Sequence, residues 1–351
     1  WHPYDRRSFL KAVFGLITGL ILSLILAAFA GENPIHILTI LGKSAFGSPY
    51  DLGLTLFYTT SLIFTGLSVC IAFHAGLFNI GAEGQLNIGA FTMAATGILF
   101  PFLPPIIAPI VAILFGVAAA AAWGWIPGYL KAKRGSHEVI ITMMMNFIAS
   151  GIVSFFIVGK LKNPNSQNPE TAEMASQFIL KSVNSESPFN FSFYLAIILA
   201  VVIWIFLYRT IWGFELRATG QNEEASQVSG INTQLYKILS LTLAGAFAGL
   251  VGLNEVIAFS GKFRLGFSAD FGFIGIAVAL LARNNPLGIL LTAFLFGALQ
   301  KGSTDLDFET QKITKDFTKI IQAIIILSVA ASVTLTNRDL KKFMQKIRGK
   351  M

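Results

Sequence analysis

Long apolar runs separated by short polar stretches dominate the pattern of this chain. A helix needs about 20 mostly apolar residues to cross a bilayer. Runs of about this length cover residues 11–30, 53–73, 104–129, 139–158, 191–208, 238–259 and 318–335. Shorter apolar stretches cover residues 86–100, 271–282 and 286–299. The pattern predicts an all-α polytopic membrane protein with about ten transmembrane helices.

Composition supports the membrane class. Of the 351 residues, 54% are hydrophobic and 13% are charged, whereas soluble domains carry about 25% charged residues. The net charge of +8 could suggest a nucleic-acid partner, but Lys and Arg stand at the ends of apolar runs, as in cytoplasmic loops of membrane proteins. We therefore expect no nucleic-acid binding. The single cysteine, Cys70, lies within an apolar run and indicates no redox compartment.

The distribution of Lys and Arg predicts the orientation. Cytoplasmic segments are expected at residues 6–11, 131–134, 209–237, at Arg283 and in the basic tail at residues 336–351. Outer loops are expected at residues 31–52, 159–190, 260–270 and 301–316. With ten crossings, both termini lie in the cytoplasm. The loop at residues 159–190, rich in Asn, Ser, Pro and Gln, is a candidate contact for an external partner.

The N-terminus resembles a twin-arginine signal peptide, because RRSFLK precedes an apolar run and AFAG. The run is longer than the roughly 7 to 15 residues of a signal peptide, and the chain after it is also membrane-embedded. A first transmembrane helix is therefore the better prediction. Because the chain begins with Trp1 rather than Met, we expect its native start to have been trimmed.

A faint internal repeat is also visible. IAFHAGLFNIG at residues 71–81 resembles IAFSGKFRLG at 257–266 with one gap, and NIGAF at 87–91 aligns with FIGIA at 273–277. With the predicted orientation the copies run in opposite directions, as in transporters with inverted repeats and interrupted helices; glycine-rich apolar sequence also produces such matches by chance. We expect one permease-like domain whose parts are a first helix and outer loop (1–52), a first repeat (53–158), an outer loop (159–190), a cytoplasmic loop (209–237), a second repeat (238–335) and a basic tail (336–351).

Polar side chains at bilayer depth are costly and by default face a protein or water interior. The candidates for a substrate pathway are Phe78, Asn79, Glu83, Gln85, Asn87, Asn146, Asn254 and Glu255. For Glu83 we favour a structural carboxylate that caps the helix starting near Gly84 or binds the broken backbone, over a proton-coupling role. The amides either touch substrate or satisfy the backbone, and Phe78 and Phe91 are weaker candidates for stacking.

No catalytic or metal-binding motif is complete. GKS at residues 42–44 lacks the first glycine of a phosphate-binding loop, because Ile37 stands in its place. HEVIIT at 137–142 lacks the second histidine of a zinc helix, and the four histidines are scattered. We therefore expect no enzyme, no metal and no cofactor in this chain.

The longest polar stretch on the predicted inner side, residues 214–237, carries helix signals. Asn222 can cap a helix, Glu223 and Glu224 favour its N-terminus, and Gly230 stops it. A short helix from 223 to 229 is predicted. It is either available to a cytoplasmic partner or part of an ordinary solvated loop.

Three motifs in order, FNIGAEGQLNIGAF (78–91), GSHEVIITMMMNFIA (135–149) and LRATGQNEEASQVSGIN (216–232), carry a family resemblance over residues 53–335. The chain resembles the permease subunits of ATP-binding cassette importers for simple sugars, branched-chain amino acids and nucleosides. It is most similar to the nucleoside members that work with a lipoprotein binding protein. The resemblance implies a multi-pass protein of the bacterial cytoplasmic membrane. Ribose or another sugar remains an alternative substrate, and a self-contained secondary transporter or channel is the alternative of another class.

The resemblance also implies partners. Residues 220–231 would form the coupling helix that docks into a separate ATPase chain, which binds ATP and Mg. The residues matched to ATPase coupling are Arg217, Gly220, Asn222, Glu223, Glu224, Ala225, Ser229 and Gly230. A second permease subunit, a paralogue or a copy of this chain, and an extracytoplasmic substrate-binding lipoprotein would complete the importer.

Overall fold

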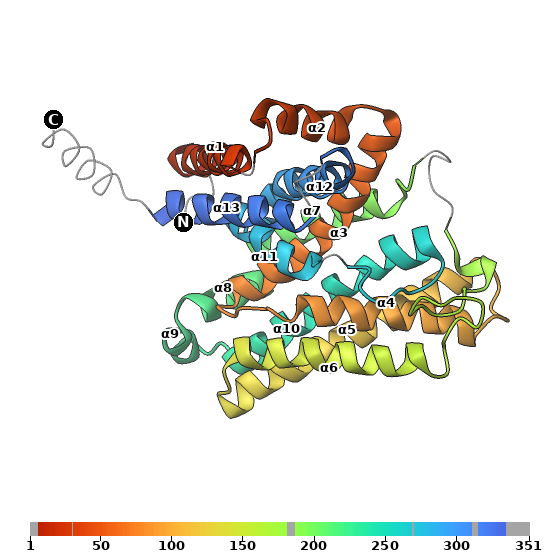
Figure 1. Cartoon of the computed structure of the whole chain (residues 1–351). Coiled ribbons are helices and arrows are strands. Elements are labelled where there is room, and N and C mark those ends of the chain that lie inside the picture. The colour runs from red at the N-terminus through yellow and green to blue at the C-terminus, as the bar shows by residue number, and fades with distance from the viewer. Residues whose placement is uncertain (1–5, 30, 181–186, 269, 311–314, 335–351) are drawn as a thin grey trace, which may run out of the picture. The chain divides into compact units, whose positions relative to one another are not determined.

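The computed structural model describes the chain except residues 1–5, 30, 181–186, 269, 311–314 and 335–351 (Figure 1). The predicted basic tail at 336–351 therefore lies outside the described residues. The helices are α1 (Arg6–Phe29), α2 (Pro34–Phe46), α3 (Pro49–His74), α4 (Ala82–Leu99), α5 (Ile107–Arg134), α6 (Glu138–Val158), η1 (Ser176–Phe178), α7 (Ser192–Arg209), α8 (Ile211–Gln221), α9 (Glu223–Val228), α10 (Thr233–Gly249), η2 (Leu253–Ser260), α11 (Phe271–Leu281), α12 (Pro286–Glu309) and α13 (Lys315–Thr334).

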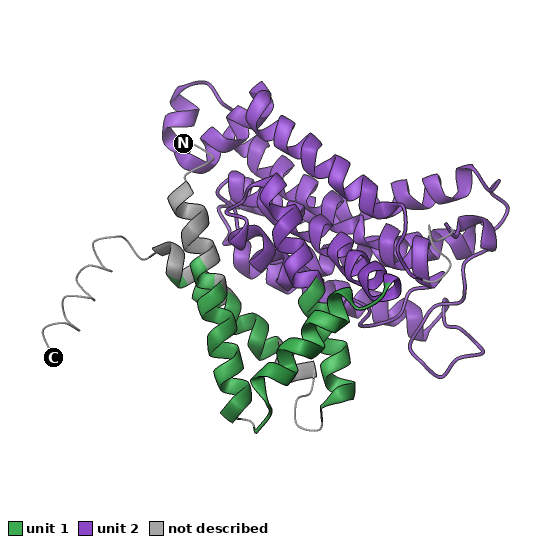
Figure 2. Cartoon of the chain, turned by 90° about the horizontal axis from the view of Figure 1, so that it is seen from above, with its two compact units in different colours: residues 1–48, 298–351 green, residues 49–297 purple. Residues whose placement is uncertain are grey.

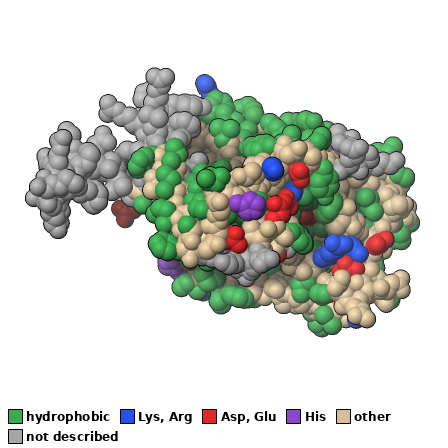
Figure 3. Space-filling view, turned by 45° about the horizontal axis from the view of Figure 1, so that its top comes forward, with side chains coloured by type: hydrophobic (Ala, Val, Ile, Leu, Met, Phe, Trp, Pro, Cys, Tyr) green, Lys and Arg blue, Asp and Glu red, His purple; other side chains and the backbone are tan. Residues whose placement is uncertain are grey.

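The all-α membrane class is confirmed. Within the described residues, six helical segments are long and apolar enough to cross a bilayer: Pro49–His74, Ile107–Arg134, Glu138–Val158, Ser192–Arg209, Thr233–Ser260 and Pro286–Glu309. Shorter apolar helices cover Ile17–Phe29 and Phe271–Leu281. Hydrophobic side chains are exposed over much of the face in Figure 3, whereas charged side chains gather in small groups. The number of ten crossings and the side of the termini stay predictions.

Two predicted outer loops are wrong as loops. Residues 31–52 contain α2, which Pro34 starts and which the Asn33 side chain caps by accepting the N–H of Ile35. Its 13 residues are too few to span a membrane, so the pattern did not distinguish it from a loop. Residues 301–316 overlap α12, which continues to Glu309. Lys301 and Asp305 pair one turn apart and stabilise this helical end, although two charges in sequence suggested a loop.

The chain divides into two compact units (Figure 2). Unit 1 holds residues 1–48 and 298–351, and within it α1 packs on α13. Its small core combines Ala27, Ile37, Ile40 and Leu306. Unit 2 holds residues 49–297 and contains every candidate pathway and coupling residue.

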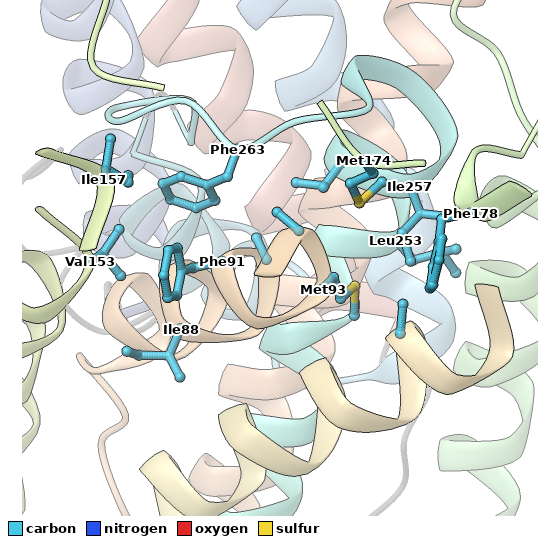
Figure 4. Close-up of a cluster of buried hydrophobic side chains, with 14 of the residues drawn as sticks. Ile88, Phe91, Met93, Val153, Ile157, Met174, Phe178, Leu253, Ile257 and Phe263 are labelled. Carbon is cyan, nitrogen blue, oxygen red and sulfur yellow. The ribbon is translucent and has the colours of Figure 1, made fainter. Parts of the chain in front are cut away.

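In unit 2, α3 is the central helix, because 83% of the residues in its apolar, membrane-spanning stretch are buried. α5 packs extensively on α10 and α4, and α11 packs on α3. A core cluster joins α4, α6, η2 and the segments around Met174 and Phe263 (Figure 4). Phe91 belongs to this cluster, with its ring centroid 5.8 Å from that of Phe263. Phe91 therefore serves packing in this structure, and its prediction as a stacking residue gains no support.

Candidate functional site

Two interrupted helices frame the candidate site, at the positions that the repeat aligns. α3 ends at His74 and α4 begins at Ala82, while η2 ends at Ser260 and α11 begins at Phe271. Gly76 and Gly261, which the alignment pairs, both have left-handed backbone, with φ of 73° and 64°. Each interruption exposes backbone groups that need partners, since no water is present in a bilayer core.

The first interruption is held by a pair of buried amides. The Asn79 Nδ2 donates to the Gln85 Oε1 at 2.9 Å, and the Gln85 Nε2 donates back to the Asn79 Oδ1 at 3.2 Å. The Asn79 Oδ1 also accepts the Gly81 N–H at 3.1 Å. Both amide side chains are almost fully buried. Their hydrogen-bonding capacity is therefore used within the fold rather than offered to a solute.

Asn146 on α6 holds the same interruption from outside. Its Oδ1 accepts the Gly84 N–H at 2.8 Å, and its Nδ2 donates to the Ile80 carbonyl at 2.9 Å. One side chain thus satisfies backbone groups on both sides of the start of α4. Of the two roles left open for Asn146, this geometry supports the structural one.

Glu83 connects the two interruptions. Its Oε2 accepts the N–H of Gly272, in the first turn of α11, at 2.8 Å, and its Oε1 accepts the Ser268 hydroxyl. Asn87 donates to the Glu83 carbonyl at 2.8 Å. Of the two structural roles expected for Glu83, the hydrogen bond to Gly272 supports binding to the broken-helix backbone, here that of α11, and not capping of the helix near Gly84. No side-chain cap comes from Asp270, which precedes α11, so the carboxylate from the other interruption takes this place.

A second polar cluster joins η2 to α3. The Asn254 Nδ2 donates to the Phe57 carbonyl at 3.0 Å and to the Ser61 hydroxyl at 2.9 Å. The Asn254 Oδ1 accepts from Asn190 at 2.8 Å and from Ser192 at 3.0 Å. Asn254 is completely buried, and its amide groups are engaged. It fixes η2 against α3 and the start of α7.

Glu255 differs from the other candidates. Its Oε1 accepts one hydrogen bond, from the Ser61 hydroxyl at 2.8 Å, and among the described residues no Lys or Arg pairs with it. The residue is 9% exposed and lies on a π-helical segment, a geometry frequent at functional sites. The rings of Phe57 and Phe259, from the same two elements, lie 5.0 Å apart, and Phe259 is exposed. A carboxylate beside exposed aromatic surface can accept N–H or O–H groups of a neutral polar solute.

Phe78, the remaining pathway candidate, packs against the end of α3. Its ring lies edge-on to Phe73 at 4.9 Å, and the side chain is half-buried. This contact supports a packing role at the first interruption.

The short helix predicted at residues 223–229 is confirmed as α9, which covers Glu223–Val228. The Asn222 Oδ1 accepts the Ala225 N–H at 3.0 Å, and Gly230 follows the helix with a φ of 83°. The rest of the predicted loop is also helical: α8 precedes α9, and α10 begins at Thr233. Glu224 and Ala225 are exposed, and so is Val228, of which 90% of the surface is accessible.

Other residues matched to coupling are engaged within the chain. The Arg217 Nε donates to the Leu207 carbonyl at 2.9 Å, and its guanidinium lies over the Tyr208 ring. Glu223 forms a 2.6 Å ion pair with Lys237 on α10. The Ser229 hydroxyl donates to the Ala225 carbonyl. The exposed surface of α9 is formed by Glu224, Ala225, Gln227 and Val228.

Sequence reasoning missed the residues that join distant segments. Ser61 sits in an apolar run, and only the hydroxyl-rich TTS at 59–61 signals a polar face on α3. The segment after α6 is joined to the second interruption through Glu170, which pairs with Lys262 at 2.9 Å and Arg264 at 3.2 Å. The Lys262 ammonium holds the pKa of the Glu170 carboxyl below its usual value. Lys181 and Glu186 of the same predicted loop lie outside the described residues.

Comparison with known proteins gives a family match over most of the chain. The family model described as branched-chain amino acid transport system / permease component matches residues 52–330. The guanosine ABC transporter permease protein NupP of Bacillus subtilis is 35% identical over 330 residues, which cover 93% of this chain and 94% of that protein. The nucleoside ABC transporter permease protein NupB of Lactococcus lactis is 34% identical, with 92% and 91% covered. The glucose ABC transporter permease protein TsgB13 of Haloferax volcanii is 28% identical, with 86% and 81% covered.

Proposed function

This chain belongs to the branched-chain amino acid transport system / permease component family, and from this premise we propose that it forms the transmembrane pathway of an ATP-driven nucleoside importer. The observation that carries the substrate class is the identity of 34% to 35%, over more than nine-tenths of the chain, with permeases named for guanosine and nucleosides. The chain is a transport subunit embedded in the cytoplasmic membrane, in keeping with its six membrane-capable segments.

The proposed importer needs further chains. In this proposal a separate ATPase, to which α9 docks, binds ATP and Mg. An extracytoplasmic lipoprotein delivers the substrate. A paralogue is the preferred second permease, because the chain also matches a second, less similar permease in each organism: NupQ at 27% identity beside NupP, and NupC at 26% beside NupB. Ten crossings with both termini in the cytoplasm complete the proposed topology.

Within the pathway, Glu255 is the proposed substrate contact. Hydrogen bonds within the fold engage the side-chain amides of Asn79, Gln85, Asn146 and Asn254. The Glu255 carboxyl group, in contrast, accepts one hydrogen bond, from the neutral Ser61 hydroxyl. Carboxylate oxygens accept from the N–H groups of a base or the hydroxyls of ribose, and exposed Phe259 offers an apolar face to the rings. A simple sugar is the second candidate substrate, supported by the match to the glucose permease.

Uptake by the reconstituted complex, with its ATPase and binding protein, tests this function. We expect ATP-dependent uptake of labelled guanosine, competed by other nucleosides and not by ribose or glucose. Glu255→Gln should raise the KM for nucleoside uptake at least tenfold, because the amide replaces one of the two oxygen atoms of the carboxyl group with an N–H donor. Glu173→Gln, the same change on a carboxylate whose side chain is 75% exposed, is the matched control.

Two results would contradict the proposal. Competition by ribose or glucose with no effect of nucleosides would replace the substrate class by simple sugars. Uptake by the permease alone, without ATPase or ATP, would indicate a secondary transporter or channel. An unchanged KM in the Glu255→Gln variant would remove Glu255 from the pathway while leaving the importer class intact.

A further inference from the structure

The C-terminal end of α8 touches the first helix interruption through backbone alone. A Cβ atom built on Gly220 would lie 2.3 Å from the His74 carbonyl oxygen and 2.6 Å from the Gly76 nitrogen. A Cβ on Gly76 would lie 3.0 Å from the Gly220 Cα. Real Cβ atoms do not approach other atoms to 2.3 Å, so this contact requires glycine at 220. Gly76 also needs its φ of 73°, which other residues rarely adopt.

On one side, this contact is joined directly to α9. Asn222 ends α8, with its N–H donating to the Ala218 carbonyl at 3.1 Å, and its side chain caps α9. No flexible linker separates the two helices, because one residue serves as the end of the first and the cap of the second. A movement of α9 is therefore carried to Gly220.

On the other side, the contact leads into both interrupted helices. Gly76 closes the end of α3, since the N–H of the next residue, Leu77, donates to the Ala72 carbonyl at 3.0 Å. The irregular segment that follows reaches the start of α4, where Glu83 holds the N–H of Gly272 on α11. A displacement at Gly76 is thus imposed on the joint between α4 and α11.

We propose that the contact between Gly220 and Gly76 transmits the movement of α9 to the helix interruptions. The conformation of the pathway then depends on the state of the ATPase. This inference rests on the proposed function, because it assumes that α9 docks on an ATPase. Gly220 and Gly76 act here as positioning residues, and neither touches substrate. Spatial connection alone does not establish coupling, so the test needs two states of the complex and a break in the link.

The first experiment breaks the link without touching the contact. Two glycines are inserted between Gln221 and Asn222, both exposed, and hydrogen exchange of residues 75–83 is compared in the nucleotide-free and ATP–vanadate-trapped complex. We expect at least a threefold nucleotide-dependent change in exchange rate in the unmodified complex, absent in the insertion variant, while α9 still responds. The same insertion after Gly135, which has open space around it, is the control and should keep the response.

The second experiment alters the contact itself. Gly220→Ala should lower nucleoside uptake per ATP hydrolysed at least fivefold, and co-purification of the ATPase is measured in parallel, so that lost ATPase binding is distinguished from lost coupling. Gly151→Ala, also within a helix but with open space, is its control. Gly76→Ala should act in the same direction, and Gly135→Ala, with a φ of 66° and open space, controls for backbone strain.

The outcomes separate this inference from the proposed function. The exchange experiment does not depend on which solute is transported. If the complex takes up no nucleoside, the proposed substrate is contradicted, but the exchange experiment can still support the link. An unmodified complex in which residues 75–83 do not respond to nucleotide overturns the link. An insertion variant that retains the full response, or a Gly220→Ala variant with normal uptake per ATP, overturns it as well.

Discussion

The Glu83 Oε2, in the first turn of α4, accepts a 2.8 Å hydrogen bond from the backbone N–H of Gly272, in the first turn of α11. These residues are 189 positions apart, and each lies between the two aligned stretches of its own repeat copy. One carboxylate therefore sits at the N-termini of two short helices, where their dipoles favour negative charge. An acidic residue at a helix joint in the membrane has a structural explanation without any proton relay.

Two substitutions of Glu83 test the contributions of its charge and of its hydrogen bonds separately. Glu83→Ala removes the acceptor of both Gly272 and Ser268 and should destabilise the protein by about 1–3 kcal/mol. Glu83→Gln keeps an acceptor and loses the charge, so about 1 kcal/mol is expected. Thermal unfolding of the purified protein in detergent measures both. Equal stability of Glu83→Ala and the unmodified protein would show that the joint does not depend on this carboxylate.

The amide pair of Asn79 and Gln85 should behave as one unit. Each single change to Ala leaves a buried amide without its partner and should cost about 1–3 kcal/mol. The double variant should cost less than the sum of the singles, with a coupling of about 1 kcal/mol in a double-mutant cycle. Nucleoside KM in the reconstituted complex should stay within twofold. A large KM change at preserved stability would instead place these amides in the pathway.

Local sequence signals predicted the elements whose causes are local. Apolar runs gave the spanning helices, and Asn222 with Glu223, Glu224 and Gly230 gave α9 within one residue of its end. Capping and apolar periodicity depend on neighbours within a few positions. The helix interruptions also have a local cause, because a glycine with left-handed backbone follows the end of each helix.

Long-range partners could not be predicted from the sequence, because they depend on residues far away along the chain. Nothing near Glu83 in sequence indicates that Gly272 will need an acceptor, and nothing near Ser61 indicates that it will meet Asn254 and Glu255. The polar residues singled out at predicted bilayer depth each have hydrogen-bond partners in the fold, and their place in a substrate pathway stays a prediction. Sequence alone did not distinguish those that satisfy backbone from Glu255, whose carboxylate has one neutral donor.

Docking of α9 on the ATPase should depend on Val228. This side chain is 90% exposed on a helix that otherwise presents Glu224, Ala225 and Gln227, and a large exposed apolar residue suits a buried interface. Val228→Asp should weaken ATPase binding at least tenfold, measured by co-purification and by affinity of the separated subunits. Val158→Asp, the same change at a position 68% exposed at the end of α6, should leave ATPase binding unchanged. Loss of binding in both variants would point to general damage.

Acid should weaken the attachment of the segment after α6, because this attachment depends on Glu170. Because the Lys262 ammonium lowers the pKa of this carboxyl, the ion pair stabilises the folded state above the unfolded-state pKa, about 4.3 for Glu. That contribution is lost as the pH falls through the lower, folded-state pKa. Glu170→Gln should therefore unfold at a temperature a few degrees below the unmodified protein at pH 6, with the difference shrinking as the pH falls below the unfolded-state pKa. The measurement is thermal unfolding in detergent across this pH range, with Glu309→Gln, at an exposed position on α12, as the control. A difference that stays constant down to the lowest pH would show that Glu170 contributes by packing and not by its charge.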